Sequence, residues 1–149
     1  MGPSNWYMPN LLGGSLEYDL DISQSGCSCD FAVYLTRMPW HDLYGNPAPH
    51  SDKSYYCDAN GIQDGAFCPN FDIHESNTFN FMARAKSCTR PNRFEHYTEC
   101  NLTGQCTRTT WQTHGSAYSP DAGSIINTKL PFHVKVSFDD EANYAIELS

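Results

Sequence analysis

One short segment, residues 70–77 with the sequence Asn-Phe-Asp-Ile-His-Glu-Ser-Asn, carries the residue types that could do chemistry. Successive side chains of a β-strand point to opposite faces, so Asn70, Asp72 and His74 would share one face. Glu75 has the opposite parity, but a β-bulge near His74 would bring its carboxyl group round to that face. Two carboxyl groups on one face raise each other's proton affinity, and glycosidases separate an acid from a base in this way. The alternative is an acidic strand end facing solvent, which the segment by itself favours.

The rest of the chain predicts the strands that would position this segment. Some stretches alternate between apolar and polar residues, as half-buried strands do, and one is apolar on both faces, as a central strand would be. Strands are predicted at residues 16–22, 31–35, 67–73, 78–82, 132–138 and 144–148. The last two are expected to form a hairpin. No segment keeps a helical period for more than two turns, so the predicted class is all-β, as a sandwich or jelly roll.

Length and charge limit the organisation and the partners. The chain has 149 residues, which favours a single domain over residues 1–149. Within it, residues 86–120 are polar and rich in Thr, Asn and Cys, which predicts a long loop excursion. Nine Lys and Arg stand against 17 Asp and Glu, a formal net charge of −8. This charge argues against nucleic acid and against an anionic membrane surface as partners, and no apolar run reaches membrane-spanning length.

Seven cysteines in a short polar chain indicate an oxidising compartment and therefore secretion. Their spacings are irregular and do not match a zinc site, so neither a metal nor another cofactor is predicted. Cys100 is expected to pair with Cys106, although Cys88 competes for either of them. The triplet that begins at Asn101, Asn-Leu-Thr, is an N-glycosylation sequon between these cysteines and predicts a glycoprotein. An odd count leaves at least one thiol free or bonded to another chain.

Residues 67–77, Phe-Cys-Pro-Asn-Phe-Asp-Ile-His-Glu-Ser-Asn, resemble the catalytic strand of glycoside hydrolase family 7. These are the fungal-type cellobiohydrolases and endoglucanases, with the signature Cys-x-Glu-x-Asp-x-x-Glu-x-Asn. Residues 18–35, 56–58 and 118–138 resemble further blocks of the same family, in the same order. The resemblance implies a concanavalin-like β-jelly roll with long disulfide-stapled loops. It also implies secretion and β-1,4-glucan or a related polysaccharide as the ligand.

The resemblance also implies roles for single residues. Glu75 matches the acid/base and Asp72 the acid that supports it. Asn70 stands where the family has its nucleophilic Glu, and an amide cannot attack an anomeric carbon as a carboxylate does. Tyr34 matches a cleft tyrosine, with core packing as the alternative. Asp58 matches an Asp that supports the acid pair, with a turn residue as the alternative.

Other positions are weighed beside these. His74 replaces the family's usual Trp and could contact substrate, hold a proton or a metal, or make a structural hydrogen bond. Trp40 and Trp111 could stack on sugar rings, because the apolar face of a pyranose matches an indole. Cys57 and Cys68 match one of the two family disulfides that tie the catalytic strand to the preceding block. Gly61 and Phe67 stand at both halves of the other family disulfide. A small basic group without an assigned role consists of Arg84, Lys86 and Arg93.

Three functions are compatible with these features. The favoured one is a secreted protein that binds β-1,4-glucan-type glycans, with hydrolysis doubtful because of Asn70. The second is an active cellulase-like hydrolase that uses Asp72 and Glu75. The third is a structural glycoprotein subunit whose open sheet edges are completed by a second copy or by a partner chain, because family members are much longer than this sequence.

Overall fold

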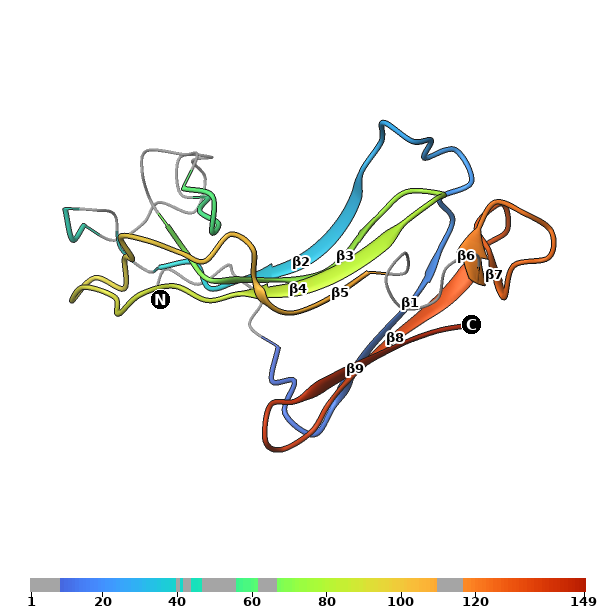
Figure 1. Cartoon of the computed structure of the whole chain (residues 1–149). Coiled ribbons are helices and arrows are strands. Elements are labelled where there is room, and N and C mark those ends of the chain that lie inside the picture. The colour runs from blue at the N-terminus through green and yellow to red at the C-terminus, as the bar shows by residue number, and fades with distance from the viewer. Residues whose placement is uncertain (1–8, 40, 42–43, 47–55, 62–66, 110–116) are drawn as a thin grey trace. The chain divides into compact units, whose positions relative to one another are not determined.

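The computed structural model describes residues 9–39, 41, 44–46, 56–61, 67–109 and 117–149. They form an all-β structure (Figure 1). The strands are β1 (Ser15–Leu20), β2 (Phe31–Thr36), β3 (Asn70–Ser76), β4 (Phe81–Lys86), β5 (Gln105–Thr109), β6 (Tyr118–Ser119), β7 (Ile126–Asn127), β8 (Phe132–Phe138) and β9 (Tyr144–Leu148). The predicted all-β class is confirmed.

The first sheet has the strand order β1-β8-β9, and all its pairs are antiparallel. In Figure 1, β8 (orange) lies between β1 (blue) and β9 (dark red). Alternation in β8 gives the sheet one apolar and one polar face: Val134 and Val136 are completely buried, while the alternating residues His133 and Lys135 are partly exposed. The hairpin of β8 and β9 has the predicted bounds, because strict period-two patterning specifies strand register.

The second sheet has the strand order β2-β3-β4-β5. β3 continues through Glu75 to Ser76, beyond the predicted end at residue 73, and β4 begins at Phe81 rather than at residue 78. The turn between them explains the shift. The side-chain oxygen of Asn77 accepts hydrogen bonds from the backbone N–H groups of Phe79 and Asn80, at 2.9 and 3.1 Å. This local side-chain turn fixes the hairpin three residues later than the apolar pattern indicates.

β5 lies inside residues 86–120, which the sequence predicts to be a loop. A tight turn just before β5 accounts for it: the N–H of Gly104 donates to the carbonyl oxygen of Asn101 at 3.2 Å, with Gly104 at φ +73°. A Cβ atom at Gly104 would approach the Ala85 carbonyl oxygen to 3.1 Å. Glycine is therefore needed both for the turn and for close packing on β4. The loop prediction is wrong for residues 105–109 and for the short strand β6.

The chain divides into two compact units. Unit 1 comprises Met1–Tyr7, Tyr34–Asp72 and Ala83–Thr107, and unit 2 comprises Met8–Val33, Ile73–Met82 and Arg108–Ser149. The boundary therefore crosses β2, β3, β4 and β5, and in β3 it falls between Asp72 and Ile73. The single domain over residues 1–149 stays a prediction.

Candidate functional site

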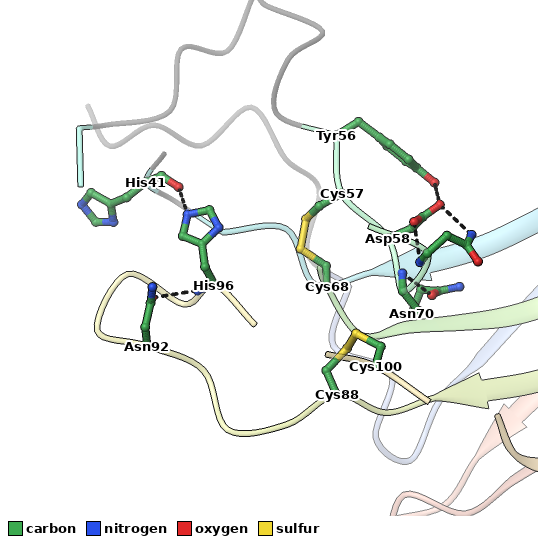
Figure 2. The surroundings of a disulfide bond; sticks show 12 residues. His41, Tyr56, Cys57, Asp58, Cys68, Asn70, Cys88, Asn92, His96 and Cys100 are labelled. Carbon is green, nitrogen blue, oxygen red and sulfur yellow. Dashed lines mark hydrogen bonds between the residues drawn. A yellow bond between two sulfur atoms is a disulfide. The ribbon is translucent and has the colours of Figure 1, made fainter. Parts of the chain in front are cut away.

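A disulfide in unit 1 attaches the segment 56–61 to the beginning of β3 (Figure 2). Cys57 is bonded to Cys68, as the family resemblance implies, and both residues are buried. The N–H of Cys68 also donates to the carbonyl oxygen of Asp58 at 2.9 Å, and Asp58 forms a bridge with Phe67. These links hold Asp58 beside the strand that carries Asn70 and Asp72.

Two tyrosines and Asp58 form a connected polar group in unit 1. The Tyr56 hydroxyl lies 3.0 Å from the Tyr34 hydroxyl and 3.1 Å from Oδ2 of Asp58. The Tyr34 and Tyr56 rings meet edge to face, with centroids 6.4 Å apart. The pKa of Tyr56 is raised, mainly by burial of its hydroxyl group and further by its contacts with Tyr34 and Asp58. Tyr34 remains 41% exposed. Its ring therefore presents apolar surface to solvent while its hydroxyl group is held by Tyr56.

Asp58 makes the contacts of a turn residue, one of the two roles that the sequence left open for it, and its support of the acid pair stays a prediction. Its Oδ1 accepts from the N–H of Asn60 at 2.8 Å, and its Oδ2 accepts from the Asn60 side-chain amide at 3.1 Å. These are the contacts of a turn residue. The bond between Asp58 and Tyr56 also joins this turn to the tyrosine pair, so Asp58 orients Tyr56 whatever further role it has.

The side-chain amide of Asn70 is buried and bonded on both sides. Its Oδ1 accepts from the N–H of Ala59 at 3.0 Å (Figure 2), and its Nδ2 donates to Oδ1 of Asp72. The first contact needs an acceptor and the second needs a donor, and an amide side chain supplies both. A carboxylate at this position would keep the bond with Ala59 but would lack the proton for the bond with Asp72.

Asp72 is held by two cations as well as by Asn70. Its Oδ2 lies 2.9 Å from Nε of Arg84 and 2.9 Å from Nζ of Lys86. The side chains of Asp72 and Lys86 are only 3% and 4% exposed. A buried carboxylate requires such partners, because an uncompensated buried charge costs several kcal/mol. Both oxygens of Asp72 are thus bonded to side chains of the protein.

The position of His74 corrects the expectation that it contacts substrate. His74 is completely buried in unit 2, and its ring packs on Phe81 and Phe132 with centroids 4.7 and 6.3 Å away. Its Nδ1 lies 3.1 Å from the Tyr18 hydroxyl and its Nε2 lies 2.6 Å from Oγ of Ser76. Burial lowers the pKa of His74 to about 4. His74 is therefore a hydrogen-bonded core residue, the structural alternative that the sequence had left open.

Glu75 follows His74 on β3 and is partly exposed, in unit 2. Asn70 and Asp72 belong to unit 1, so the structure describes the three candidate catalytic positions on one strand but in two units. The catalytic roles of Glu75 and Asp72 stay predictions. Trp40 and Trp111 lie outside the described residues.

The second family disulfide, missing from this sequence, is replaced by packing. A Cβ atom added to Gly61 would lie 2.5 Å from Cε1 and Cζ of Phe67, so the phenyl ring occupies the space next to the glycine. Gly61 has φ +62°, a conformation that favours glycine. The paired change to Gly61 and Phe67 therefore places the phenyl ring against the glycine where the family has a disulfide.

Besides the bond between Cys57 and Cys68, the structure has a disulfide between Cys88 and Cys100. The predicted pair of Cys100 with Cys106 is therefore wrong. Cys88 and Cys100 face each other across an antiparallel bridge, and the N–H of Thr89 donates to the carbonyl oxygen of Glu99 at 3.0 Å. The chain thus returns on itself between residues 88 and 100 (Figure 2). Direct cross-strand pairing brings these two cysteines together, which linear spacing cannot show.

The described residues show neither a metal-binding cluster nor a membrane-spanning helix. In the described ranges, no group of three or more His, Cys, Asp or Glu side chains is arranged to hold a metal ion. Among the same residues, no helix is long and apolar enough to span a membrane.

Sequence reasoning missed several contributors to this site, notably Tyr56 and the backbone of Ala59. Arg84 and Lys86 were recognised only as a basic group without a role. Their signal was the i, i+2 spacing, which places two side chains on one face of a strand. Arg93, the third basic residue, lies over the ring of Phe94 with its guanidinium carbon 4.5 Å from the ring centroid.

No family model matches the chain, and no curated protein matches it significantly. Solved structures do. A mutant of the Humicola insolens endocellulase superposes with a TM-score of 0.76 and 20% identity, over 97% of this chain and 43% of that chain. A cellobiohydrolase from Melanocarpus albomyces, complexed with cellotetraose, gives a TM-score of 0.71 and 19% identity, over 99% and 44% of the two chains.

A glycoside hydrolase family 7 cellobiohydrolase from Daphnia pulex gives a TM-score of 0.68 and 19% identity, over 93% of this chain and 42% of that chain. This chain spans less than half the length of these enzymes. Identities near 20% support a statement about fold and none about activity. The chain has the β-jelly-roll fold of family 7 cellulases, as its sequence blocks indicate.

Proposed function

We propose that this protein binds β-1,4-glucan-type glycans and does not cleave them efficiently. The observation that carries the proposal is the environment of Asn70. The residue aligned with the nucleophile is a buried amide, fixed between Ala59 and Asp72.

The absence of efficient cleavage is argued from covalent chemistry. A retaining glycosidase needs a carboxylate that attacks the anomeric carbon and forms a glycosyl ester. Asn70 cannot form this ester. Asp72 is a poor substitute, because its two oxygens are engaged with Asn70, Arg84 and Lys86. The alternative of a hydrolase that uses Asp72 and Glu75 would have to break the buried ion contacts of Asp72.

The binding of glycan is argued from the tyrosine pair. Sugar rings have apolar faces that pack on aromatic side chains, while their hydroxyl groups need fixed polar partners. Tyr34 offers a partly exposed ring, and Tyr56 and Asp58 fix its hydroxyl end. A ring that is already ordered loses little entropy when a ligand binds.

The test of the proposal is the Asn70→Glu variant, assayed beside the parent on a soluble chromogenic cellobioside. The proposal predicts negligible turnover by the parent. Turnover by Asn70→Glu would show that only the nucleophile was lost. Brisk turnover by the parent, abolished by Glu75→Gln, would refute the proposal and favour the active hydrolase.

A second candidate function, a structural subunit, is favoured by two observations. In the part of the chain that the structure describes, β1 and β9 are the edges of one sheet and β2 and β5 the edges of the other. Cys27 and Cys29 are exposed and form no disulfide there. Open edges recruit further strands, and exposed thiols can link chains. The mass in solution, with and without reductant, tests this candidate: a monomer under both conditions excludes it.

Secretion belongs to the same proposal. Two disulfides indicate folding in an oxidising compartment. Recovery of the protein from the medium of cells that express the full-length gene would support this location, and retention inside the cells would contradict it.

A further inference from the structure

The turn at residues 101–104 combines a sequon with a rigid support. Cys100, which precedes it, is bonded to Cys88, and the N–H of Asn101 donates to the carbonyl oxygen of Ser87 at 2.9 Å. On its other side, the N–H of Gly104 closes the turn onto the carbonyl oxygen of Asn101. The backbone of Asn101 is thus held on both sides, whereas its side chain is exposed.

The side chain of Asn101 is oriented by the threonine of its own sequon. Its Oδ1 accepts from the N–H of Thr103 at 3.2 Å and from the Thr103 hydroxyl at 2.7 Å. Both bonds are made by the oxygen. Among the described residues, the Nδ2 group of this exposed asparagine has no hydrogen-bond partner, so the nitrogen that a glycan would occupy is not engaged by the protein.

A concavity of about 580 Å³ lies beside this turn. Its lining includes Ser87, Thr89, Glu99 and Leu102, and Leu102 is 49% exposed. Hydroxyl and carboxyl groups beside an apolar side chain are the mixture that complements a sugar, which has hydroxyl groups around an apolar ring face.

We propose that Asn101 carries an N-linked glycan and that the first sugars of this glycan lie in the concavity beside it. The donor would be an oligosaccharide on a lipid pyrophosphate, used by the transferase of the secretory pathway. The bond between Nδ2 and the anomeric carbon forms, the bond from that carbon to the pyrophosphate oxygen breaks, and the amide loses one proton. This site is independent of the glycan-binding function proposed above, and either can fail without the other.

The test is the intact mass of the protein secreted by a eukaryotic host, before and after peptide N-glycosidase. The proposal predicts a glycan mass that the enzyme removes, leaving aspartate at position 101. Asn101-Leu102-Thr103 is the single Asn-x-Ser/Thr triplet of the chain, so no second site interferes. Asn101→Gln and Thr103→Ala should both abolish the added mass, and the matched control Thr103→Ser should retain it.

An unmodified parent, secreted by cells that glycosylate a reference protein, would overturn the proposal. The place of the sugars is tested by hydrogen exchange. Residues 87–89 and 99–103 should exchange more slowly in the glycosylated protein than after enzymatic removal, while the β8–β9 turn at residues 139–143 should not change. Equal exchange at residues 87–89 in both forms would place the glycan outside the concavity.

Discussion

The substitution Asn70→Asp isolates the buried contact between positions 70 and 72. It keeps the shape of the side chain and the acceptor for Ala59, but it replaces the donor that faces Asp72 with an oxygen. Loss of a hydrogen bond to a charged group costs about 1.5–3 kcal/mol. The new contact between two carboxylates adds to this, while Arg84 and Lys86 offset part of the repulsion. We expect a loss of about 3 kcal/mol in the free energy of unfolding at neutral pH.

The loss should depend on pH with a definite sign. Burial and the neighbouring carboxylate would raise the pKa of the new carboxyl group in the folded state above its unfolded value. The folded variant then binds the extra proton more readily than the unfolded chain does. Its penalty is therefore present above the folded pKa and shrinks as the pH falls, because the protonated acid donates to Asp72 as the amide of Asn70 does.

Urea denaturation of parent and variant, followed by circular dichroism at pH 7.5 and pH 4.5, measures both effects. The matched control is Asn60→Asp, because the Asn60 amide also donates to an aspartate, Asp58, but in an exposed position. The control should cost less than about 1 kcal/mol. The reasoning is refuted by equal costs for Asn70→Asp and Asn60→Asp, or by a cost of Asn70→Asp that does not change with pH.

Three further predictions concern stability. The pKa of His74 is about 4 in the folded state and about 6.5 in the unfolded chain, so the unfolded chain binds the extra proton first as the pH falls. The free energy of unfolding should therefore drop by about 3 kcal/mol between pH 6.5 and pH 4. Urea titrations at each pH would measure this drop, and a constant free energy would contradict the buried neutral ring. Replacing Cys57 and Cys68 by Ser should cost about 3 kcal/mol in the same assay, since their sequence separation is 11 residues, and a free thiol at either position in a non-reducing peptide map would contradict the bond. Gly61→Ala should lower the melting temperature because of its positive φ and its close ring contact, whereas Gly26→Ala, which meets nothing within 4 Å, should change it little; equal shifts would refute the packing argument.

The sequence predicts the fold where local pattern decides it. Residues 132–138 and 144–148 alternate strictly, and these bounds are those of β8 and β9. β5 could not be predicted in this way, because its position depends on the turn at Gly104 and on packing against β4. The end of β3 was similarly missed, since the side chain of Asn77 sets the turn.

Only part of the candidate site could likewise be predicted from the sequence. The disulfide of Cys57 with Cys68 followed from matched sequence blocks, which preserve long-range neighbours. The sequence could not choose between substrate contact and a structural role for His74, because strand parity gives the face of a side chain and not what covers that face. The rings of Phe81 and Phe132 cover it here. The role of Lys86 depends on a contact 14 positions away, with Asp72, which no local pattern contains.

The central claim, binding without cleavage, is tested most directly by titrating cellotetraose into the protein by calorimetry and then analysing the recovered sugar by chromatography. The account predicts saturable binding, intact cellotetraose, and a loss of affinity of about tenfold or more in Tyr34→Ala, equivalent to about 1.4 kcal/mol. Tyr44→Ala, at another exposed tyrosine, should bind as the parent does. Cellobiose in the recovered sugar, or no binding by the parent, would contradict the account.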